Sequence, residues 1–258
     1  MEIFDSHCHL NDEQLYSRID EVILRAQQAG VTKMLVVGWD YNSSIRAIEI
    51  AHTYEFCYAA IGFHPENVFD VDEVNLNKLL GFYNDEKVVA IGEIGLDYHW
   101  TKEEDKREIQ KEFFIRQLEF ANSKNMPVII HNRDAFEDCL NILKEHKPVA
   151  SGSMHCYSGS VEYLKEVLDI GLVIGLDGPV TFKNAKTPKE VAEIVPLDKL
   201  LLETDCPYLT PHPLRGSLNE PVNIRLILDE IANIKGLSKK HIAEVTFNNT
   251  CRLFRIEK

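Results

Sequence analysis

The chain has 258 residues, of which 45% are hydrophobic and 27% are charged. Its 28 basic and 41 acidic residues give a formal net charge of −13, which argues against a broad basic surface that binds nucleic acid without regard to sequence. The acidic balance leaves open a site at which bound metal ions supply positive charge locally.

Short apolar runs rich in β-branched residues alternate along the chain with longer amphipathic segments. Parallel strands that are buried on both faces have such nearly continuous hydrophobic runs. We predict strands, in chain order, over residues 2–9, 33–38, 57–64, 88–95, 127–132, 150–157, 171–178 and 200–207.

Apolar residues at helical spacing mark segments between several of these strands and after the last one. We predict helices, in chain order, over residues 17–30, 104–125, 134–146, 160–171, 220–236 and 239–256. Eight predicted strands, each followed by a helix or by a loop that leads to one, indicate a (β/α)₈ TIM barrel. In this fold the active site lies at the C-terminal ends of the strands. An open doubly wound sheet is the alternative. No linker interrupts the alternation, so we expect one domain over residues 1–258.

The predicted strands end in a restricted set of polar residue types. These strand-end residues are His7, His9, His64, Glu93, His131, His155 and Asp205. In a closed barrel such positions converge on one mouth, where barrel enzymes hold their catalytic groups. Imidazole and carboxylate are ligands of zinc, manganese and iron, and carboxylate with water also suits magnesium.

The whole set favours a metal site more strongly than any single member does. A lone pair such as His7-x-His9 is more often two ordinary histidines, and Asp205 could simply begin a turn. Alternate strand residues point the same way, however, so both rings of the pair can face the barrel axis. Burying all these groups unpaired would be unfavourable. We therefore predict two divalent cations (Mg, Mn or Zn) that share Glu93.

Two arginines are candidates for substrate binding. Arg133 follows His131 closely, and Arg215 lies in the long segment "TPHPLRGSLNEP". Each could be an ordinary surface arginine, or its guanidinium could clamp a phosphate or carboxylate. The "SGS" segment after Tyr157 is likewise either a helix N-terminus that binds an anion or a plain N-cap.

The remaining sequence features bear on the compartment. Six cysteines are scattered along the chain without a C-x-x-C pair, and Cys8 alternates away from its two histidine neighbours. The N-terminus has no basic segment before an apolar stretch, so we expect reduced thiols in a cytoplasmic protein. No apolar run approaches the roughly 20 residues of a membrane span, so we expect no membrane association. A monomer is our expectation for the oligomeric state.

Six motifs in this order resemble the TatD family of metal-dependent deoxyribonucleases, within the amidohydrolase-like barrel superfamily. They are "DSHCHL", "GFHP", "GEIGLDYH", "H-x-RDA", "HCYSG" and "ETDCPYL". The resemblance runs from Asp5 to at least Pro221, which is most of the chain. It implies a magnesium-dependent nuclease, often a 3′→5′ exonuclease on single-stranded DNA.

The same resemblance implies how the strand-end residues divide between two metal ions. His7, His9, Glu93 and Asp205 would hold one ion, and Glu93, His131 and His155 would hold the other. His64 would lie near the metals as a substrate or phosphate contact. The chain departs from the family in the "R-G-x-x-N-E-P" segment, where Ser217 and Leu218 stand in place of basic residues.

These inferences predict hydrolysis of a phosphodiester bond by a water that two metal ions activate. Two ions about 3.5–4 Å apart can lower the pKa of a shared water towards neutrality. We expect Glu93 and Asp205 to be the catalytic carboxylates, with Asp205 orienting the water and accepting its proton. His64, Arg133 and Arg215 are the expected substrate contacts, and single-stranded DNA or a small phosphodiester is the expected substrate.

Two alternatives remain, because a fold does not determine a substrate. The first is amidohydrolase-type hydrolysis of a small ester or amide, which includes D-aminoacyl-tRNA deacylation. The second is a non-catalytic metal-binding or scaffold protein. A non-catalytic protein would be expected to lack the general base or the bridging carboxylate. Asp205 and Glu93, the candidates for these two groups, are both present.

Overall fold

A computed structural model describes residues 1–257, and its centre is a sheet of eight parallel strands in the order β1 to β8. The strands are β1 (Ile3–Cys8), β2 (Val31–Val37), β3 (Cys57–Ile61), β4 (Val88–Asp97), β5 (Val128–Arg133), β6 (Gly152–Met154), β7 (Val173–Leu176) and β8 (Leu200–Leu202). Each strand overlaps a segment predicted from the sequence. The sequential order confirms the TIM barrel and makes the doubly wound alternative wrong, because such a sheet reverses its strand order partway.

Hydrogen bonds between the first and last strands bring the sheet round on itself. Ser6 Oγ donates to the carbonyl of Leu202 at 2.9 Å. Beyond the end of β8, Asp205 N donates to the carbonyl of His7 at 2.9 Å, and His9 N donates to the carbonyl of Cys206 at 2.8 Å. The segments that carry His7, His9 and Asp205 are therefore held side by side.

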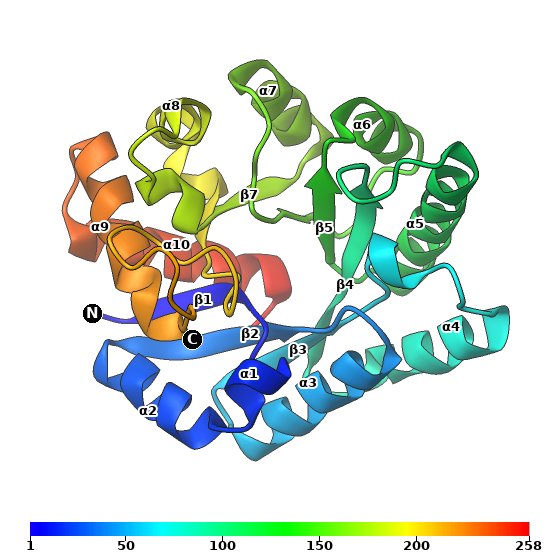
Figure 1. The fold of residues 1–258 in the computed structure, drawn as a ribbon, viewed down its shortest axis with the longest axis horizontal. Helices are drawn as coiled ribbons and strands as arrows, with labels where there is room; N and C mark the ends of the chain where they lie inside the picture. Colours follow the sequence, from blue (N-terminus) through cyan, green and yellow to red (C-terminus); the bar gives the residue numbers. More distant parts are fainter. Residues whose placement is uncertain (258) are drawn as a thin grey trace.

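Helices surround the strands on the outside (Figure 1). They are α1 (Glu13–Tyr16), α2 (Ile19–Gln28), α3 (Tyr41–Thr53), α4 (Glu73–Leu80), α5 (Glu104–Lys124), α6 (Phe136–Glu145), α7 (Val161–Ile170), α8 (Lys186–Ile194), α9 (Ile224–Lys235) and α10 (Lys239–Phe254). Short 3₁₀ helices lie at η1 (Pro65–Asn67), η2 (Gly81–Asn84), η3 (Gly178–Thr181), η4 (Leu197–Lys199) and η5 (Pro221–Asn223).

The six helices predicted from sequence are confirmed as α2, α5, α6, α7, α9 and α10. The structure adds α1, α3, α4 and α8, which the apolar spacing did not identify. For α3 the signal was a capping box: Asp40 accepts from Ser43 N at 2.7 Å, and Ser43 Oγ accepts from Asp40 N at 2.9 Å.

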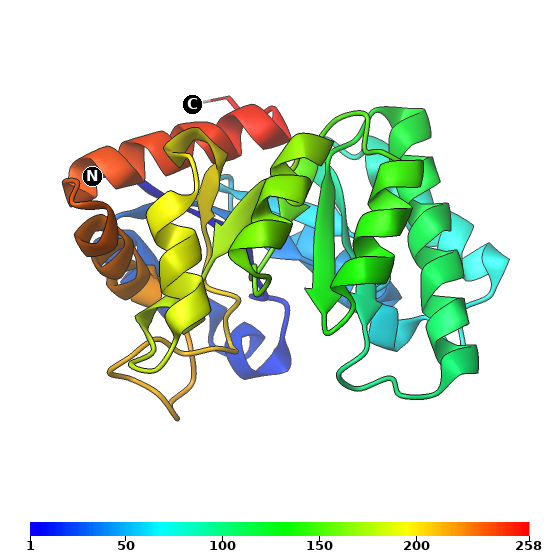
Figure 2. The same ribbon diagram turned by 90° about the horizontal axis from the view of Figure 1, so that it is seen from above.

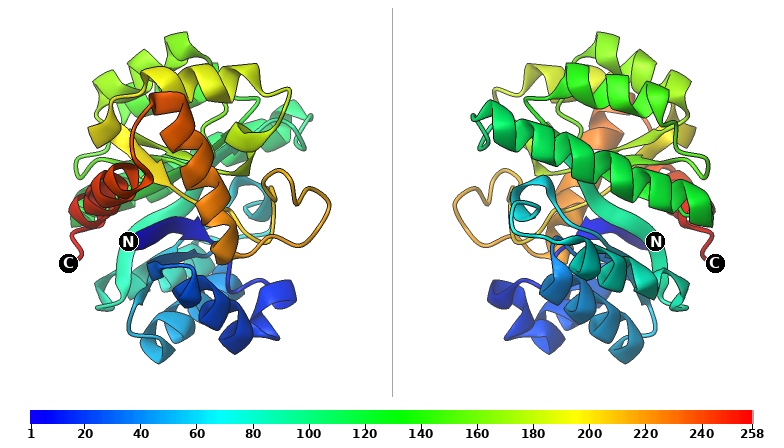
Figure 3. Two further views of the ribbon diagram at one scale, coloured as in Figure 1. Left: turned by 90° about the vertical axis from the view of Figure 1, so that its left-hand side faces the viewer. Right: turned by 90° about the vertical axis from the view of Figure 1, so that its right-hand side faces the viewer.

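The inside of the barrel is apolar at one end and polar at the other. Phe4, Leu35 and Leu201 belong to a buried cluster that also contains Phe247 and Phe254 of α10. Figure 3 shows α10, in red, at one end of the barrel and the loop after β8, in orange, at the other. Helix α10 thus closes the end opposite the strand C-termini, and the strand C-termini form the mouth.

Two segments extend beyond the strand ends at the mouth. One connects β4 to α5, and the other connects β8 to η5 (Figure 2). Among the described helices, none combines the length and apolar character needed to cross a membrane.

Candidate metal centre

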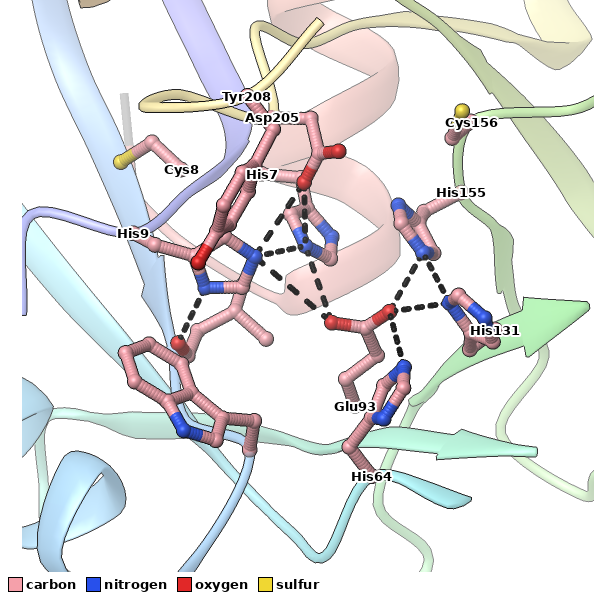
Figure 4. Close-up of polar contacts among 12 residues, drawn as sticks. His7, Cys8, His9, His64, Glu93, His131, His155, Cys156, Asp205 and Tyr208 are labelled. Atoms are coloured by element: carbon pink, nitrogen blue, oxygen red, sulfur yellow. Dashed lines mark hydrogen bonds and ion pairs between the residues drawn. The ribbon is translucent and has the colours of Figure 1, made fainter. Parts of the chain in front are cut away.

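All seven strand-end residues singled out in the sequence lie at the mouth of the barrel, and their side chains converge (Figure 4). His7 lies in β1, Glu93 in β4 and His131 in β5. The others, His9, His64, His155 and Asp205, follow the ends of β1, β3, β6 and β8. The predicted strands around His155 and Asp205 end earlier than expected, because the backbone turns away from the extended conformation. Cys156 has φ 42° and Asp205 has φ 54°, both in the left-handed region.

One half of the cluster consists of two imidazoles and two carboxylates. His7 Nε2 lies 3.2 Å from His9 Nε2, 3.5 Å from Glu93 Oε2 and 3.7 Å from Asp205 Oδ1. His9 Nε2 lies 3.3 Å from Asp205 Oδ1 and 3.8 Å from Glu93 Oε2. The ligand atoms of His7, His9 and Asp205 all lie within 4.8 Å of one another, and Glu93 Oε2 lies within 3.8 Å of both nitrogens, so this half could hold a divalent cation.

The other half of the cluster uses the second oxygen of Glu93. Glu93 Oε1 lies 2.7 Å from His131 Nδ1 and 2.6 Å from His155 Nε2. The two imidazole nitrogens are 3.2 Å apart. Oε2 faces the first half and Oε1 faces this one, so Glu93 contacts both halves of the cluster.

Hydrogen bonds on the far side of two rings orient their lone pairs toward the centre. His9 Nδ1 donates to the carbonyl of Val37 at 2.9 Å, which leaves Nε2 free to ligate. His131 Nε2 contacts Asp97 Oδ2 at 3.1 Å, which leaves Nδ1 facing Glu93. Such outer partners fix the tautomer and the ring orientation of metal-binding histidines.

His64 presents an N–H group to the cluster. Its Nδ1 accepts a hydrogen bond from Glu66 N at 3.1 Å, so in the neutral ring Nε2 carries the proton. Nε2 lies 3.8 Å from Glu93 Oε1. Burial, together with the nearby His131, lowers the pKa of His64 to about 3, so the ring is neutral at pH 7. His64 therefore offers an N–H donor beside the cluster rather than a lone pair.

The carboxylates of the cluster hold protons on two of its rings, and a bound cation would replace these protons. Burial alone would lower the pKa of His131, but Asp97 and Glu93 raise it to about 9, and Asp205 and Glu93 likewise raise the pKa of His9. Burial alone would raise the pKa of Glu93, but His155, His131 and His7 hold it well below its usual value. Burial, with the nearby His155, lowers the pKa of His7 to about 4, so that ring is neutral at pH 7 and able to ligate.

The buried carboxylates of Glu93 and Asp205 lack the side-chain cations that usually balance such groups. Within residues 1–257, no lysine or arginine forms an ion pair with either one; their partners are histidines. A buried charge needs compensation from a partner or a metal. The residues present therefore fit divalent cations.

Two further buried carboxyl groups, those of Asp97 and Glu203, adjoin this cluster and were not among the residues predicted for the site. Asp97 lies four residues after Glu93 on the same strand, so alternation along β4 could have indicated that both face inward. Glu203 Oε1 lies 4.0 Å from His155 Nδ1. A side chain at Gly175 would displace the Glu203 carboxyl from its present position. Burial and the nearby Asp177 raise the pKa of Glu203 well above its usual value.

The two predicted substrate arginines lie at the rim rather than in the cluster. The guanidinium carbon of Arg133 is 5.7 Å from the centre of the Trp100 ring, and that of Arg215 is 3.8 Å from the centre of the Phe182 ring. Among residues 1–257, no carboxylate forms an ion pair with either arginine. Both are exposed. Their contact with substrate stays a prediction.

Two smaller predictions have structural outcomes. Ser160 is a plain N-cap, whose side chain accepts from Tyr163 N at the start of α7. Cys8 points away from the cluster and donates to the carbonyl of Leu35 at 3.4 Å. A further contact holds the end of the loop after β8 against α2, because Arg25 Nε forms an ion pair with Glu220 Oε2 at 2.7 Å.

Asn219 supports the segment that carries Asp205. Its buried Nδ2 donates to the carbonyl of Thr204 at 2.9 Å and to that of Tyr208 at 2.6 Å. We expect Asn219→Ala to lower the free energy of unfolding by about 2 kcal/mol, because both carbonyls lose their donor. Urea unfolding measures the loss, with the exposed Asn141→Ala on α6 as the control. Equal midpoints for the two variants would contradict this role.

Comparisons with known proteins place the chain in a family. The family model described as "TatD related DNase" matches residues 4–255. "Uncharacterized metal-dependent hydrolase YabD" of Bacillus subtilis (strain 168) is 48% identical over 255 residues, which cover 98% of this chain and 99% of the relative. "Uncharacterized metal-dependent hydrolase YcfH" of Escherichia coli (strain K12) is 38% identical over 262 residues, which cover 100% of this chain and 97% of the relative. The crystal structure of YJJV, a TatD homolog from Escherichia coli K12, is 31% identical with a TM-score of 0.93, covering 99% of this chain and 98% of that one.

Proposed function

The chain belongs to the TatD-related DNase family and is a metal-dependent hydrolase, and we propose that it hydrolyses phosphodiester bonds of single-stranded DNA from the 3′ end. The observation that carries the proposal is the placement of Glu93. Its two carboxylate oxygens face two separate groups of ligand atoms. Two cations held by one carboxylate suit phosphoryl transfer, in which an attacking and a leaving oxygen both need stabilisation.

The proposed ligands divide as the two halves of the cluster do. His7, His9, Glu93 and Asp205 would hold one cation, and Glu93 with His131 and His155 would hold the other. When bound, divalent cations would supply a water of lowered pKa and would offset the negative charge of the phosphate. Magnesium, manganese and zinc all fit donors of these types.

Asp205 is the proposed proton acceptor. Burial alone would raise its pKa, but His9, His155 and His7 around it lower the pKa below its usual value, so it is ionised at pH 7. Its Oδ1 lies 3.3 Å from His9 Nε2 and 3.7 Å from His7 Nε2, and it would orient a water molecule through a hydrogen bond. Glu93 is the second proposed catalytic carboxylate, because it positions both halves of the cluster.

Three further groups are proposed to contact the substrate. His64 presents its Nε2–H beside Glu93 and would donate to a phosphate oxygen. Arg133 and Arg215 lie on different segments of the rim and would neutralise phosphates of the strand on either side of the cleaved bond. These local cations matter because the chain as a whole has a net charge of −13.

The test is a nuclease assay with controlled metal content. The protein is stripped with a chelator, divided, and reloaded with Mg²⁺, Mn²⁺ or Zn²⁺. Each sample then receives 5′-labelled single-stranded DNA with a free 3′ end. We expect a ladder of products shortened from the 3′ end that requires the restored metal.

A matched substrate with a blocked 3′ end distinguishes exonuclease from endonuclease activity. Cleavage of the blocked strand at internal sites would contradict the exonuclease part of the proposal. No cleavage of either strand, with metal bound in stoichiometric amounts, would overturn the nuclease proposal. It would leave hydrolysis of a small ester or amide, including D-aminoacyl-tRNA deacylation, as the function to test.

A further inference from the structure

Trp100 is an exposed aromatic side chain at the mouth of the barrel. It lies in the segment between β4 and α5 that extends beyond the strand ends (Figure 2), and 65% of its surface is exposed. Large aromatic side chains normally bury most of their surface, so a tryptophan held in the open beside a candidate active site suggests a binding role.

The backbone at Trp100 is tied to the metal cluster through one carboxylate. Asp97 Oδ1 accepts from His99 N at 2.9 Å and from Trp100 N at 3.0 Å. The other oxygen of the same side chain contacts His131 Nε2 at 3.1 Å. The position of the indole is therefore coupled to the position of a proposed ligand.

The segment after Trp100 is also held in place. Thr101 Oγ1 donates to Glu66 Oε1 at 2.6 Å and accepts from Gln110 Nε2 at 2.9 Å. Lys102 Nζ donates to the carbonyl of Tyr98 at 2.7 Å. The exposed ring thus stands on an anchored segment, and little conformational entropy would be lost when a ligand packs on it.

A cation lies over the Trp100 ring. The Arg133 guanidinium carbon is 5.7 Å from the centre of the Trp100 ring, and His99 meets the same ring edge-on at 4.8 Å. Arg133 lies two residues after His131 in β5, so its strand carries the platform and a proposed ligand together. An exposed aromatic face with a neighbouring guanidinium matches a flat, π-rich ring that carries an anionic group.

We propose that Trp100 and Arg133 form a subsite that stacks an unpaired nucleobase and binds its phosphate next to the cleaved bond. This inference rests on the proposed function, and it explains why the substrate would be single-stranded rather than duplex DNA. In a duplex both faces of a base are covered by its neighbours, whereas in a single strand a base can leave the stack and pack on an aromatic side chain.

The test compares wild type, Trp100→Ala and Trp100→Phe on three substrates. These are a single-stranded oligonucleotide, the same strand with an abasic residue placed in turn at each of the last positions, and methyl p-nitrophenyl phosphate, a diester without a base. We expect Trp100→Ala to raise KM for the intact strand about tenfold, because stacking of one base contributes about that factor in affinity. Trp100→Phe should restore most of the loss.

The abasic series and the base-free diester separate stacking from a general structural effect. At one abasic position Trp100→Ala should cause no further rise in KM, and hydrolysis of the diester should be unchanged. The control variant is Val149→Ala, which truncates a side chain that is 69% exposed and precedes β6 at the other end of the barrel. An unchanged KM for the intact strand in Trp100→Ala would overturn the subsite while the proposed function stands.

A binding measurement keeps the two proposals distinguishable if no cleavage is found. The chain has 2 tryptophans, so Trp100→Phe leaves Trp39 as the only indole and isolates the Trp100 signal. We expect single-stranded DNA to quench Trp100 fluorescence more than duplex DNA of the same sequence does. Quenching without cleavage would retain the subsite and reject the reaction, and absence of quenching would overturn the subsite.

Discussion

Replacement of Asp205 by asparagine is expected to lower turnover by about 10³-fold, within the range that general acid–base groups contribute. Asparagine keeps the shape of the side chain, but it carries no charge and does not accept a proton from water. Asp205 Oδ1 lies 3.3 Å from His9 Nε2 and 3.7 Å from His7 Nε2. Because asparagine keeps an oxygen in a side chain of the same shape, we expect the rings of His7 and His9 to stay in place. The measurement is kcat on 5′-labelled single-stranded DNA, with metal content determined on the same sample.

The control for this experiment is Asp198→Asn, which makes the same chemical change in an exposed side chain of η4, near the opposite end of the barrel. Its activity should equal that of wild type. If Asp205→Asn keeps full activity with metal bound, Asp205 is not the proton acceptor. If it loses both metal and activity, ligation rather than proton transfer is its main role.

Replacement of Glu93 by glutamine is expected to remove metal and activity together. The carboxamide offers one oxygen and one NH₂ group, so it cannot face both halves of the cluster with acceptors. Mutation of a residue that only hydrogen-bonds to a metal ligand lowers metal affinity by about 10–100-fold. Because Glu93 contacts both halves of the cluster, we expect Glu93→Gln to lower metal affinity by at least about 100-fold. Metal catalysis supplies several kcal/mol, so activity should fall by about 10³-fold or more.

Metal content after gel filtration, measured by mass spectrometry, tests this expectation directly. The control is Glu49→Gln, an exposed substitution on α3 that lies outside the cluster. Thermal unfolding with and without chelator adds a second readout, because a ligand that binds only the folded state raises its stability. A Glu93→Gln protein that retains wild-type metal content would contradict the bridging role.

The sequence determined the strands and the residue types at the candidate site. A strand buried on both faces has a local signature, since every residue of a run such as "MLVV" (residues 34–37) is apolar. The convergence of His7 with Asp205 then followed from the rule that parallel strands in a barrel end at one mouth. Helices such as α3 were missed because serines and asparagine in the first turn weaken the helical pattern.

Only the tertiary structure decided which atom of each side chain faces which partner. The proton on His64 Nε2 depends on a hydrogen bond from Glu66, and the role of Glu220 depends on an arginine 195 residues away. Likewise, Asp97 joins His131 to the exposed Trp100, although nothing in the residue pattern marks that connection. Hydrophobic burial repeats along the chain and can be recognised locally, whereas a hydrogen bond between distant segments leaves no periodic trace in the sequence.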